Sequence, residues 1–154
     1  MRVLMETVSA GEMPYPTAGE VLWEAPDFLH IKVLEGIESN HPEGLYHALL
    51  VGLHEFVEMI LCRRQQVSYE EICKWDIDHL DADEPGQLPD APYHRQHMAA
   101  ENLEQLLAWM LKLNLNEYDE AVQRAVLDVP DPNWTKYQEA VQRTHPQLSP
   151  RAGS

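Results

Sequence analysis

The segment LYHALLVGLHEFVEMILCRR, residues 45–64, sets the architecture expected of this chain. Its apolar residues recur mostly at three- and four-residue spacing, which is the period of one face of an α-helix. The pattern predicts a helix from about Leu45 to Arg64. The segment is unusual in one respect, because residues 45–62 contain neither Lys nor Arg. A helix that carries acidic residues and no basic ones attracts a cation.

The polar residues of this helix gather near one face. His54 and Glu58 are four residues apart, so their side chains can converge on one ion, and Glu55 sits beside them. This spacing follows the H-E-x-x-H motif, in which the outer residues hold zinc and the glutamate is the general base. Glu58 replaces the last histidine, and a carboxylate is also a zinc ligand. The carboxylate makes manganese and iron alternatives to zinc.

A second polar stripe lies in residues 92–113, which predict another helix. His94, His97 and Glu101 occupy positions i, i+3 and i+7 and therefore share a face. Either histidine would complete a three-ligand site with the pair on the first helix. Glu101 would orient a ligating imidazole or bind a second ion.

This second helix contains both small and large apolar residues. Ala100 and Ala108 are small enough to let a neighbouring helix approach closely. We expect the large apolar side chains to be buried, namely Met98, Leu103, Leu106, Leu107 and Met110. The two stripes together predict two central helices that pack antiparallel and face each other across a metal site.

The remaining segments complete an α+β protein that is mostly α-helical. Residues 1–20 predict an extended arm after a short strand at Met1–Met5. Residues 29–33 alternate between apolar and polar side chains as a half-buried strand does, and the two runs around Pro26-Asp27 predict a β-hairpin over residues 21–34. Ser68 and Glu71 fit a helix capping box. The expected order is a loop over 36–44, helices at 45–64, 69–80, 92–113, 116–127 and 132–143, an acidic loop at 81–92, one globular domain over 21–143, and a flexible tail over 144–154.

Composition narrows the classes of partner. The net charge of −15 repels nucleic acid, and Arg63-Arg64 is the only basic cluster in the sequence. The acidity favours cations or a basic protein surface as partners. Two cysteines are too few for a secreted disulfide scaffold, and no apolar run is long enough to span a membrane. We therefore expect a cytoplasmic protein.

A resemblance rests on several short motifs of the chain. The order of a hairpin, then LHEFVE at 53–58, then a later helix with further ligands resembles the core of minimal zincin metallopeptidases. The set LHEFVE, WD at 75–76, EPG at 84–86 and APYHxxHxxA at 91–100 is similar to small uncharacterised proteins encoded by bacteriophages. This likeness covers about residues 14–122 and implies a phage origin, hence a host cytoplasm. Glu58 stands where zincins have their second histidine.

Two hypotheses from different classes follow. In the first, the chain is a metal-dependent hydrolase in which His54, Glu58 and either His94 or His97 hold the ion and Glu55 is the base. Zinc is the preferred ion. In the second, the chain is a non-catalytic acidic phage protein, with a structural metal or none, that binds a host or phage protein or peptide. The sequence leaves the oligomeric state open.

Two further residues have alternative roles. Tyr93 would donate a hydrogen bond to a developing oxyanion or simply pack in the core. Cys62 shares the first polar stripe and would be a thiol nucleophile, although a buried cysteine usually behaves as a small apolar residue.

Overall fold

A computed structural model describes residues 1–25, 27–39 and 41–148 of the chain. The expected hairpin is present, formed by β2 (Gly19–Ala25) and β3 (Phe28–Leu34), which pair antiparallel with Val21 opposite Ile31. Alternate residues of β3 are fully buried, as the sequence pattern predicted. Pro26, in the expected turn, lies outside the described residues. The α+β, mostly helical class is confirmed.

The chain begins with a third strand that is longer than the one expected over residues 1–5. Strand β1 (Arg2–Val8) pairs parallel with β3, so the sheet order is β1-β3-β2. The expected arm is therefore wrong for residues 6–8. Met5 of β1 lies against the central helix, where a Cβ on Gly52 would sit 2.6 Å from the Met5 Sδ atom. This contact packs β1 against the core. The strand that pairs with β1 lies far away in the sequence, so a local sequence pattern does not reveal the pairing.

The helices follow in the expected order with shifted ends. A short helix that was expected as loop, α1 (Glu35–Ser39), buries Ile37. The others are α2 (Gly44–Arg64), α3 (Tyr69–Asp78), α4 (His94–Leu111), α5 (Leu115–Leu127) and α6 (Thr135–Thr144), with 3-10 turns η1 (Ala10–Glu12), η2 (Pro85–Gln87) and η3 (Pro132–Trp134). The capping box is confirmed, because Glu71 N–H donates to Ser68 Oγ at 3.2 Å and Ser68 N–H donates to Glu71 Oε2 at 2.8 Å.

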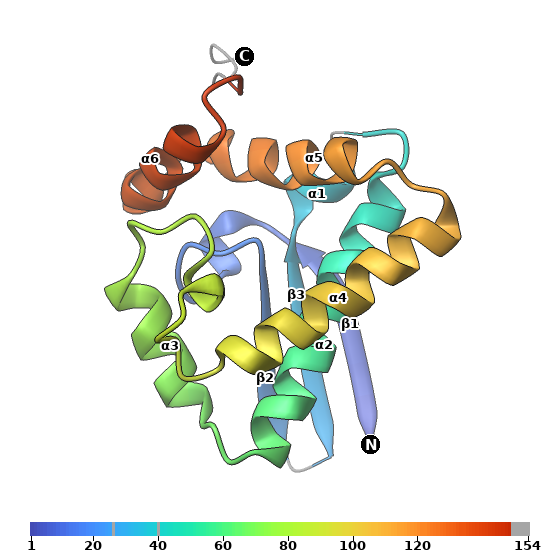
Figure 1. The fold of residues 1–154 in the computed structure, drawn as a ribbon, viewed down its shortest axis with the longest axis vertical. Helices are drawn as coiled ribbons and strands as arrows, with labels where there is room; N and C mark the ends of the chain where they lie inside the picture. Colours follow the sequence, from blue (N-terminus) through green and yellow to red (C-terminus); the bar gives the residue numbers. More distant parts are fainter. Residues whose placement is uncertain (26, 40, 149–154) are drawn as a thin grey trace.

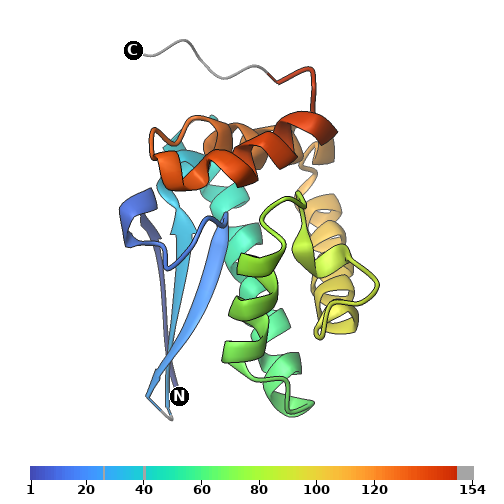
Figure 2. The same cartoon turned by 90° about the vertical axis from the view of Figure 1, so that its left-hand side faces the viewer.

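The elements form layers around α2. Figures 1 and 2 show the sheet on one side of α2, α4 on the other side, and α5 and α6 across one end. By length and composition alone, α2 would be able to cross a membrane. Here it packs between the sheet and α4 and buries Leu50, Val51 and Met59, as the core helix of a globular protein does. Its polar face is thereby enclosed rather than exposed to solvent.

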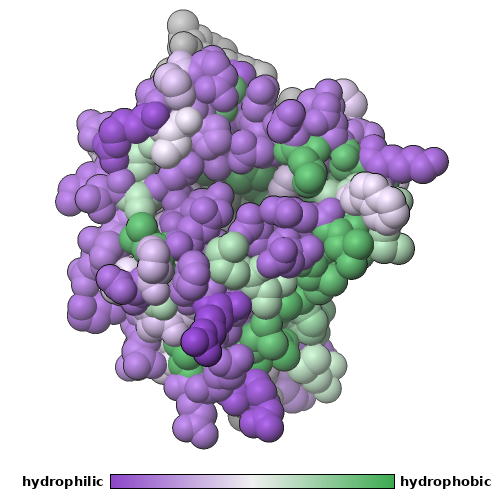
Figure 3. Space-filling model, viewed as in Figure 1, coloured by the Kyte–Doolittle hydropathy of each residue, from purple (hydrophilic) through white to green (hydrophobic). Residues whose placement is uncertain are grey.

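Helix α4 is rotated relative to the sequence expectation. Three of its residues expected in the core are exposed, with Leu103 at 39%, Leu106 at 50% and Met110 at 63%. The small side chains of Ala100 and Ala108 are buried instead and let α4 lie close to α2. Figure 3 shows apolar surface on the side of the molecule where α4 runs. Close helix packing has therefore prevailed over burial of the largest side chains.

The C-terminal segment is anchored for part of its length. A flexible tail was expected from residue 144, but Leu148 is only 2% exposed. His145 Nε2 also lies 3.1 Å from Asp83 Oδ2, which ties the segment to the loop before α4. The expectation is therefore wrong for residues 144–148. Residues 149–154 lie outside the described residues.

Candidate metal centre

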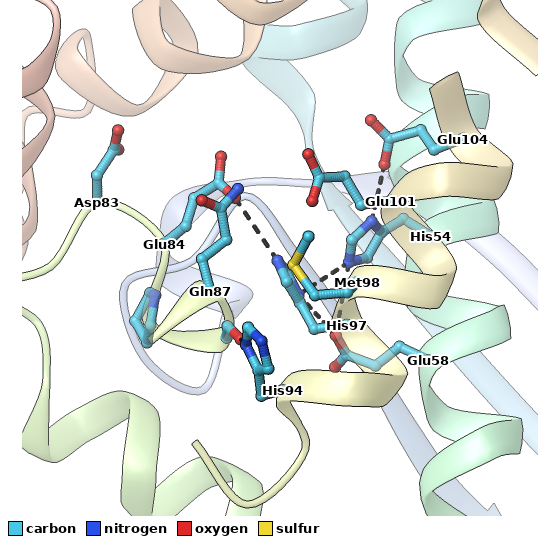
Figure 4. A network of polar contacts seen from close by, with 12 residues as sticks. His54, Glu58, Asp83, Glu84, Gln87, His94, His97, Met98, Glu101 and Glu104 are labelled. Carbon is cyan, nitrogen blue, oxygen red and sulfur yellow. Dashed lines mark hydrogen bonds and ion pairs between the residues drawn. The ribbon is translucent and has the colours of Figure 1, made fainter. Parts of the chain in front are cut away.

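The polar faces of α2 and α4 meet at one cluster of three side chains. His97 Nδ1 of α4 lies 2.8 Å from Glu58 Oε2 of α2 and 3.2 Å from His54 Nε2 of α2. His54 Nε2 lies 3.5 Å from Glu58 Oε2, which closes the triangle. Figure 4 shows the three groups converging between the two helices. Their side chains are between 10% and 13% exposed, so the cluster is largely shielded from water.

The size of this triangle is that of one face of a zinc site. Zinc binds imidazole nitrogen and carboxylate oxygen at about 2.0–2.1 Å in tetrahedral geometry, which places neighbouring ligand atoms about 3.3 Å apart. The three distances of 2.8, 3.2 and 3.5 Å lie around that value. The group could therefore hold a metal ion with only small adjustments of its side chains.

Each imidazole of the cluster has a second carboxylate on its other nitrogen. His54 Nδ1 lies 2.8 Å from Glu104 Oε2, and His97 Nε2 lies 3.6 Å from Glu84 Oε2. Metal-binding histidines in proteins usually make such a contact, because it fixes the tautomer and turns the free lone pair toward the ion. The contact to Glu84 is longer than a hydrogen bond, and His97 Nε2 has no hydrogen-bond partner among the described residues.

These contacts shift the pKa values of all three side chains. Burial acts to lower the pKa of His54, but the contacts with Glu104 and Glu58 outweigh it and raise that pKa to about 11. For His97, burial again opposes the shift, and Glu58 and Glu84 raise its pKa to about 9. Burial would raise the pKa of Glu58, but the contacts with the two imidazoles lower it. The cluster therefore sits in a strongly negative field that favours a bound cation.

Glu55 lies beside the cluster, on the side of the sheet. A Cβ on Gly19 of β2 would lie 2.8 Å from Glu55 Oε1, so glycine at that position makes room for the carboxyl group. Burial, followed by the charge of Glu58, raises the pKa of Glu55 well above its usual value of 4.5, although His54 opposes the shift. The side chain lines the same cavity as the cluster. It is placed to exchange a proton with a molecule bound there.

Two residues predicted as ligands lie outside the triangle. His94 Nδ1 donates to the carbonyl oxygen of Gly86 at 3.1 Å, and Figure 4 shows its ring on the far side of His97 from Glu101. Glu101 Oε1 accepts a hydrogen bond from Gln105 Nε2 at 2.9 Å. Of the two histidines that the sequence left open, the structure brings His97 to His54 and Glu58.

Tyr93 and Cys62 serve the core. The hydroxyl of Tyr93 donates to Asp76, so it is not directed at the cluster. Cys62 is fully buried, and burial raises the pKa of its thiol to about 12. A thiol held in its protonated form is a poor nucleophile. Both residues therefore take the packing role that the sequence analysis weighed against the chemical one.

Glu84 and Glu104 were not among the residues predicted from the sequence. Glu104 takes the imidazole-orienting place that was considered for Glu101, one turn earlier on α4. Its signal was present in the sequence, because Glu104 follows His97 by seven residues and so falls on the same face. Glu84 lies in the acidic loop. A loop has no periodic pattern, so the sequence did not indicate that this residue reaches the cluster.

The cluster opens into a cavity of about 420 Å³, which lies within the usual size range of small-molecule sites. Strand β2, helices α2, α4 and α5, and the turn η2 contribute to its wall. Gly86 of η2 allows the wall to close in, since a Cβ there would lie 2.6 Å from His97 Nδ1. The candidate ligands are thus accessible to a small molecule through this cavity.

A second group of potential ligands lies at the start of α2. His41, Glu43 and His47 place one ligand atom each within 4.8 Å of the others. His47 is fully buried, and neither of its ring nitrogens has a hydrogen-bond partner among the described residues. The rings of His41 and His47 stack with centroids 4.7 Å apart. The carboxylate contact on His41 is longer than those of the first group, with Nε2 3.9 Å from Glu117 Oε2.

Comparison with protein-family models, with curated proteins and with solved structures finds no match for this chain. The likeness to zincins and to bacteriophage-encoded proteins therefore stays a prediction.

Proposed function

We propose that this protein is a metal-dependent hydrolase that holds a divalent ion through His54, Glu58 and His97. The observation that supports it is the triangle of ligand atoms, 2.8 to 3.5 Å apart, at the wall of a cavity. Three protein ligands leave coordination positions free, as catalytic metal sites require and structural zinc sites do not. The location of the cluster at a cavity favours catalysis over a purely structural ion.

Zinc is the ion that the donor set favours. Two imidazoles and one carboxylate form a known catalytic zinc set, whereas magnesium and calcium prefer oxygen ligands. Two imidazoles and one carboxylate also suit iron and manganese, which remain the alternatives. The orienting contacts of Glu104 and Glu84 fit a metal-bound state, because each would accept the remaining N–H of a ligating imidazole.

The proposed chemistry divides between the ion and Glu55. A bound zinc ion supplies Lewis acidity and lowers the pKa of a water molecule to near neutrality. Glu55 accepts the proton of the attacking water and returns it to the leaving group. A carboxyl whose pKa is raised above its usual value is more readily protonated by the attacking water and can return that proton. Gly19 leaves the space that this carboxyl occupies, because a Cβ there would lie 2.8 Å from Glu55 Oε1.

The metal site is tested by titration of the chelator-treated protein with zinc. The wild type should bind zinc, and His97→Ala should lose that binding because it removes one of three ligands. His41→Ala is the matched control, since it removes an imidazole from the other His/Glu group. If His41→Ala abolishes zinc binding and His97→Ala does not, the ion belongs to that other group and the proposed centre is wrong.

Catalysis is tested separately from binding. With zinc bound, we expect hydrolysis of 4-nitrophenyl acetate and of fluorogenic peptides, and Glu55→Gln should retain zinc while losing at least a hundredfold in turnover, a typical size for a general base. Zinc binding with no turnover, together with unfolding on removal of the ion, would favour the non-catalytic alternative, in which the metal clamps α2 to α4. Loss of zinc in Glu55→Gln would refute the base role.

A further inference from the structure

The wall of the cavity is acidic throughout. Nine carboxyl side chains line it, and the described residues contribute no Lys or Arg to it. His145 lies at one end, with Nε2 3.1 Å from Asp83 and Nδ1 3.6 Å from Asp119. A zinc ion would add two positive charges. Only Glu58 of the nine is a proposed ligand of that ion, so the carboxyl-lined wall still attracts positive charge when the proposed metal site is filled.

Several oxygens in this wall also lack a hydrogen-bond donor. The buried acceptors without a partner among the described residues include Asp83 Oδ1, Glu101 Oε2 and Gln123 Oε1. All three residues line the cavity. Gln123 is only 4% exposed, so water at the protein surface does not satisfy it. Buried polar atoms in folded proteins are almost always paired, and these three call for a ligand that brings donors.

The unpartnered acceptors near the metal cluster come from three different elements. Asp83 precedes the turn η2, Glu101 lies on α4, and Gln123 lies on α5. Figure 4 shows the carboxyl groups of Asp83 and Glu101 on one side of His97, whereas Glu58 lies on the other. A molecule between them would thus have one end at the acceptors and the other end at the proposed ion.

We infer that the cavity binds a positively charged group of the substrate, an alkylammonium or a guanidinium, at Asp83, Glu101 and Gln123. An ammonium brings three N–H donors and a guanidinium brings five, with no acceptor in either, which matches the surplus of acceptor oxygens. The volume of about 420 Å³ admits a molecule of that kind. As a statement about the substrate, this inference rests on the proposed hydrolase, but the binding of amines can be measured without turnover.

Binding is tested with three probes of the same four-carbon length. Zinc-loaded protein is titrated calorimetrically with putrescine, 1,4-butanediol and succinate, which differ in charge and not in size. We expect putrescine to bind at least tenfold more tightly than the diol and succinate not to bind. Agmatine and a short arginine-containing peptide amide, used in parallel, distinguish a free amine from a basic side chain. Equal affinity for putrescine and butanediol, or no binding of either, would overturn the inference.

Two variants separate a local contact from the overall charge of the protein. Glu101→Gln should weaken putrescine binding about tenfold, a typical loss for one charge-assisted contact. Glu120→Gln removes the same charge from the exposed face of α5 and should change the affinity by less than twofold. Equal effects of the two variants would mean that only the net charge attracts amines, contrary to the inference.

The outcomes for the ion and for the amine are distinguishable. Because the carboxylates remain without zinc, the metal-free protein should bind putrescine at least as tightly as the loaded one. Zinc binding without amine binding refutes the substrate class and leaves the metal centre standing. Amine binding without zinc binding refutes the hydrolase instead. A second equivalent of zinc that excludes putrescine and is lost in Glu101→Gln would assign these acceptors to a metal rather than to an amine.

Discussion

Binding of zinc to this protein should release close to two protons at pH 7.5. The reason is that both candidate imidazole ligands are in the doubly protonated imidazolium form in the metal-free protein, because the pKa is about 11 for His54 and about 9 for His97. A nitrogen must lose its proton before it can donate a lone pair to an ion. Glu58 contributes no proton, because its pKa is lowered by the same contacts.

The expected number follows from these two values. At pH 7.5 a group with a pKa of 9 is about 97% protonated and one with a pKa of 11 is fully protonated, so their sum is about two. Two ordinary imidazoles with a pKa of 6.5 would together release only about 0.2 proton at this pH. Because zinc displaces two protons, its apparent affinity should rise about a hundredfold per pH unit between pH 6.5 and 8.5. The surrounding carboxylates thus make this site far more sensitive to pH than an isolated pair of histidines.

Calorimetric titrations with zinc in buffers of different ionisation enthalpy give the number of released protons directly. His97→Ala should release no more than one proton wherever residual binding is measurable. Glu55→Gln separates any proton that leaves Glu55, whose pKa is also raised. Release of less than half a proton by the wild type at pH 7.5, or an affinity independent of pH above 7, would refute the proposed ligand set and its carboxylate contacts.

Three further outcomes test other parts of the structure. Glu104→Gln should weaken zinc binding by about 10- to 100-fold, because it removes the carboxylate on His54, and the exposed-site control Glu120→Gln should leave it unchanged within twofold. Gly86→Ala should weaken zinc binding at least tenfold, since its Cβ would lie 2.6 Å from His97 Nδ1, whereas Gly11→Ala, with nothing within 4 Å, should behave as the wild type. In urea denaturation with chelator present, the free energy of unfolding should fall as pH rises from about 4.5 to 7, by up to about 3 kcal/mol from Glu20 alone, because its folded-state pKa is about 7 against 4.5 unfolded. Glu20→Gln should flatten that decline, and an unchanged profile would argue against a buried protonated carboxyl at this position.

The sequence was sufficient for the parts of the fold that carry local periodicity. The i, i+4 spacing of His54 and Glu58 placed two candidate ligands on one helix, and the Ser68 capping box located the start of α3. The full length of β1 and its pairing were beyond reach, because its partner β3 lies more than twenty residues away, with β2 between them in the chain. A five-residue helix such as α1 is likewise too short to show a period.

The choice among the residues of α4 depended on the rotation of that helix against α2. At 100° per residue, Glu104 and Ala108 lie within about 20° of His97, whereas Glu101 and His94 lie about 40° and 60° away. Ala108 is fully buried, so the face of α4 that carries Ala108 is the one that packs against α2. We expected the large apolar residues, Leu106 and Met110 among them, to face inward. That orientation would place the opposite face of α4 against α2. Burial of alanine was therefore the signal that selected His97 and Glu104.

The described part of the chain contributes no Lys or Arg to the cavity around the cluster, and this feature joins the fold to the proposed function. A buried carboxylate is costly unless it is paired, and folded proteins usually supply an arginine or lysine for that purpose. Here the pairing is left to two histidines, which can give up their protons, and several acceptor oxygens have no donor among the described residues. A fixed basic side chain would satisfy these groups permanently and close the cavity. Without such a side chain these groups stay available to exchangeable cations, which are the metal ion and the positively charged ligand that we propose.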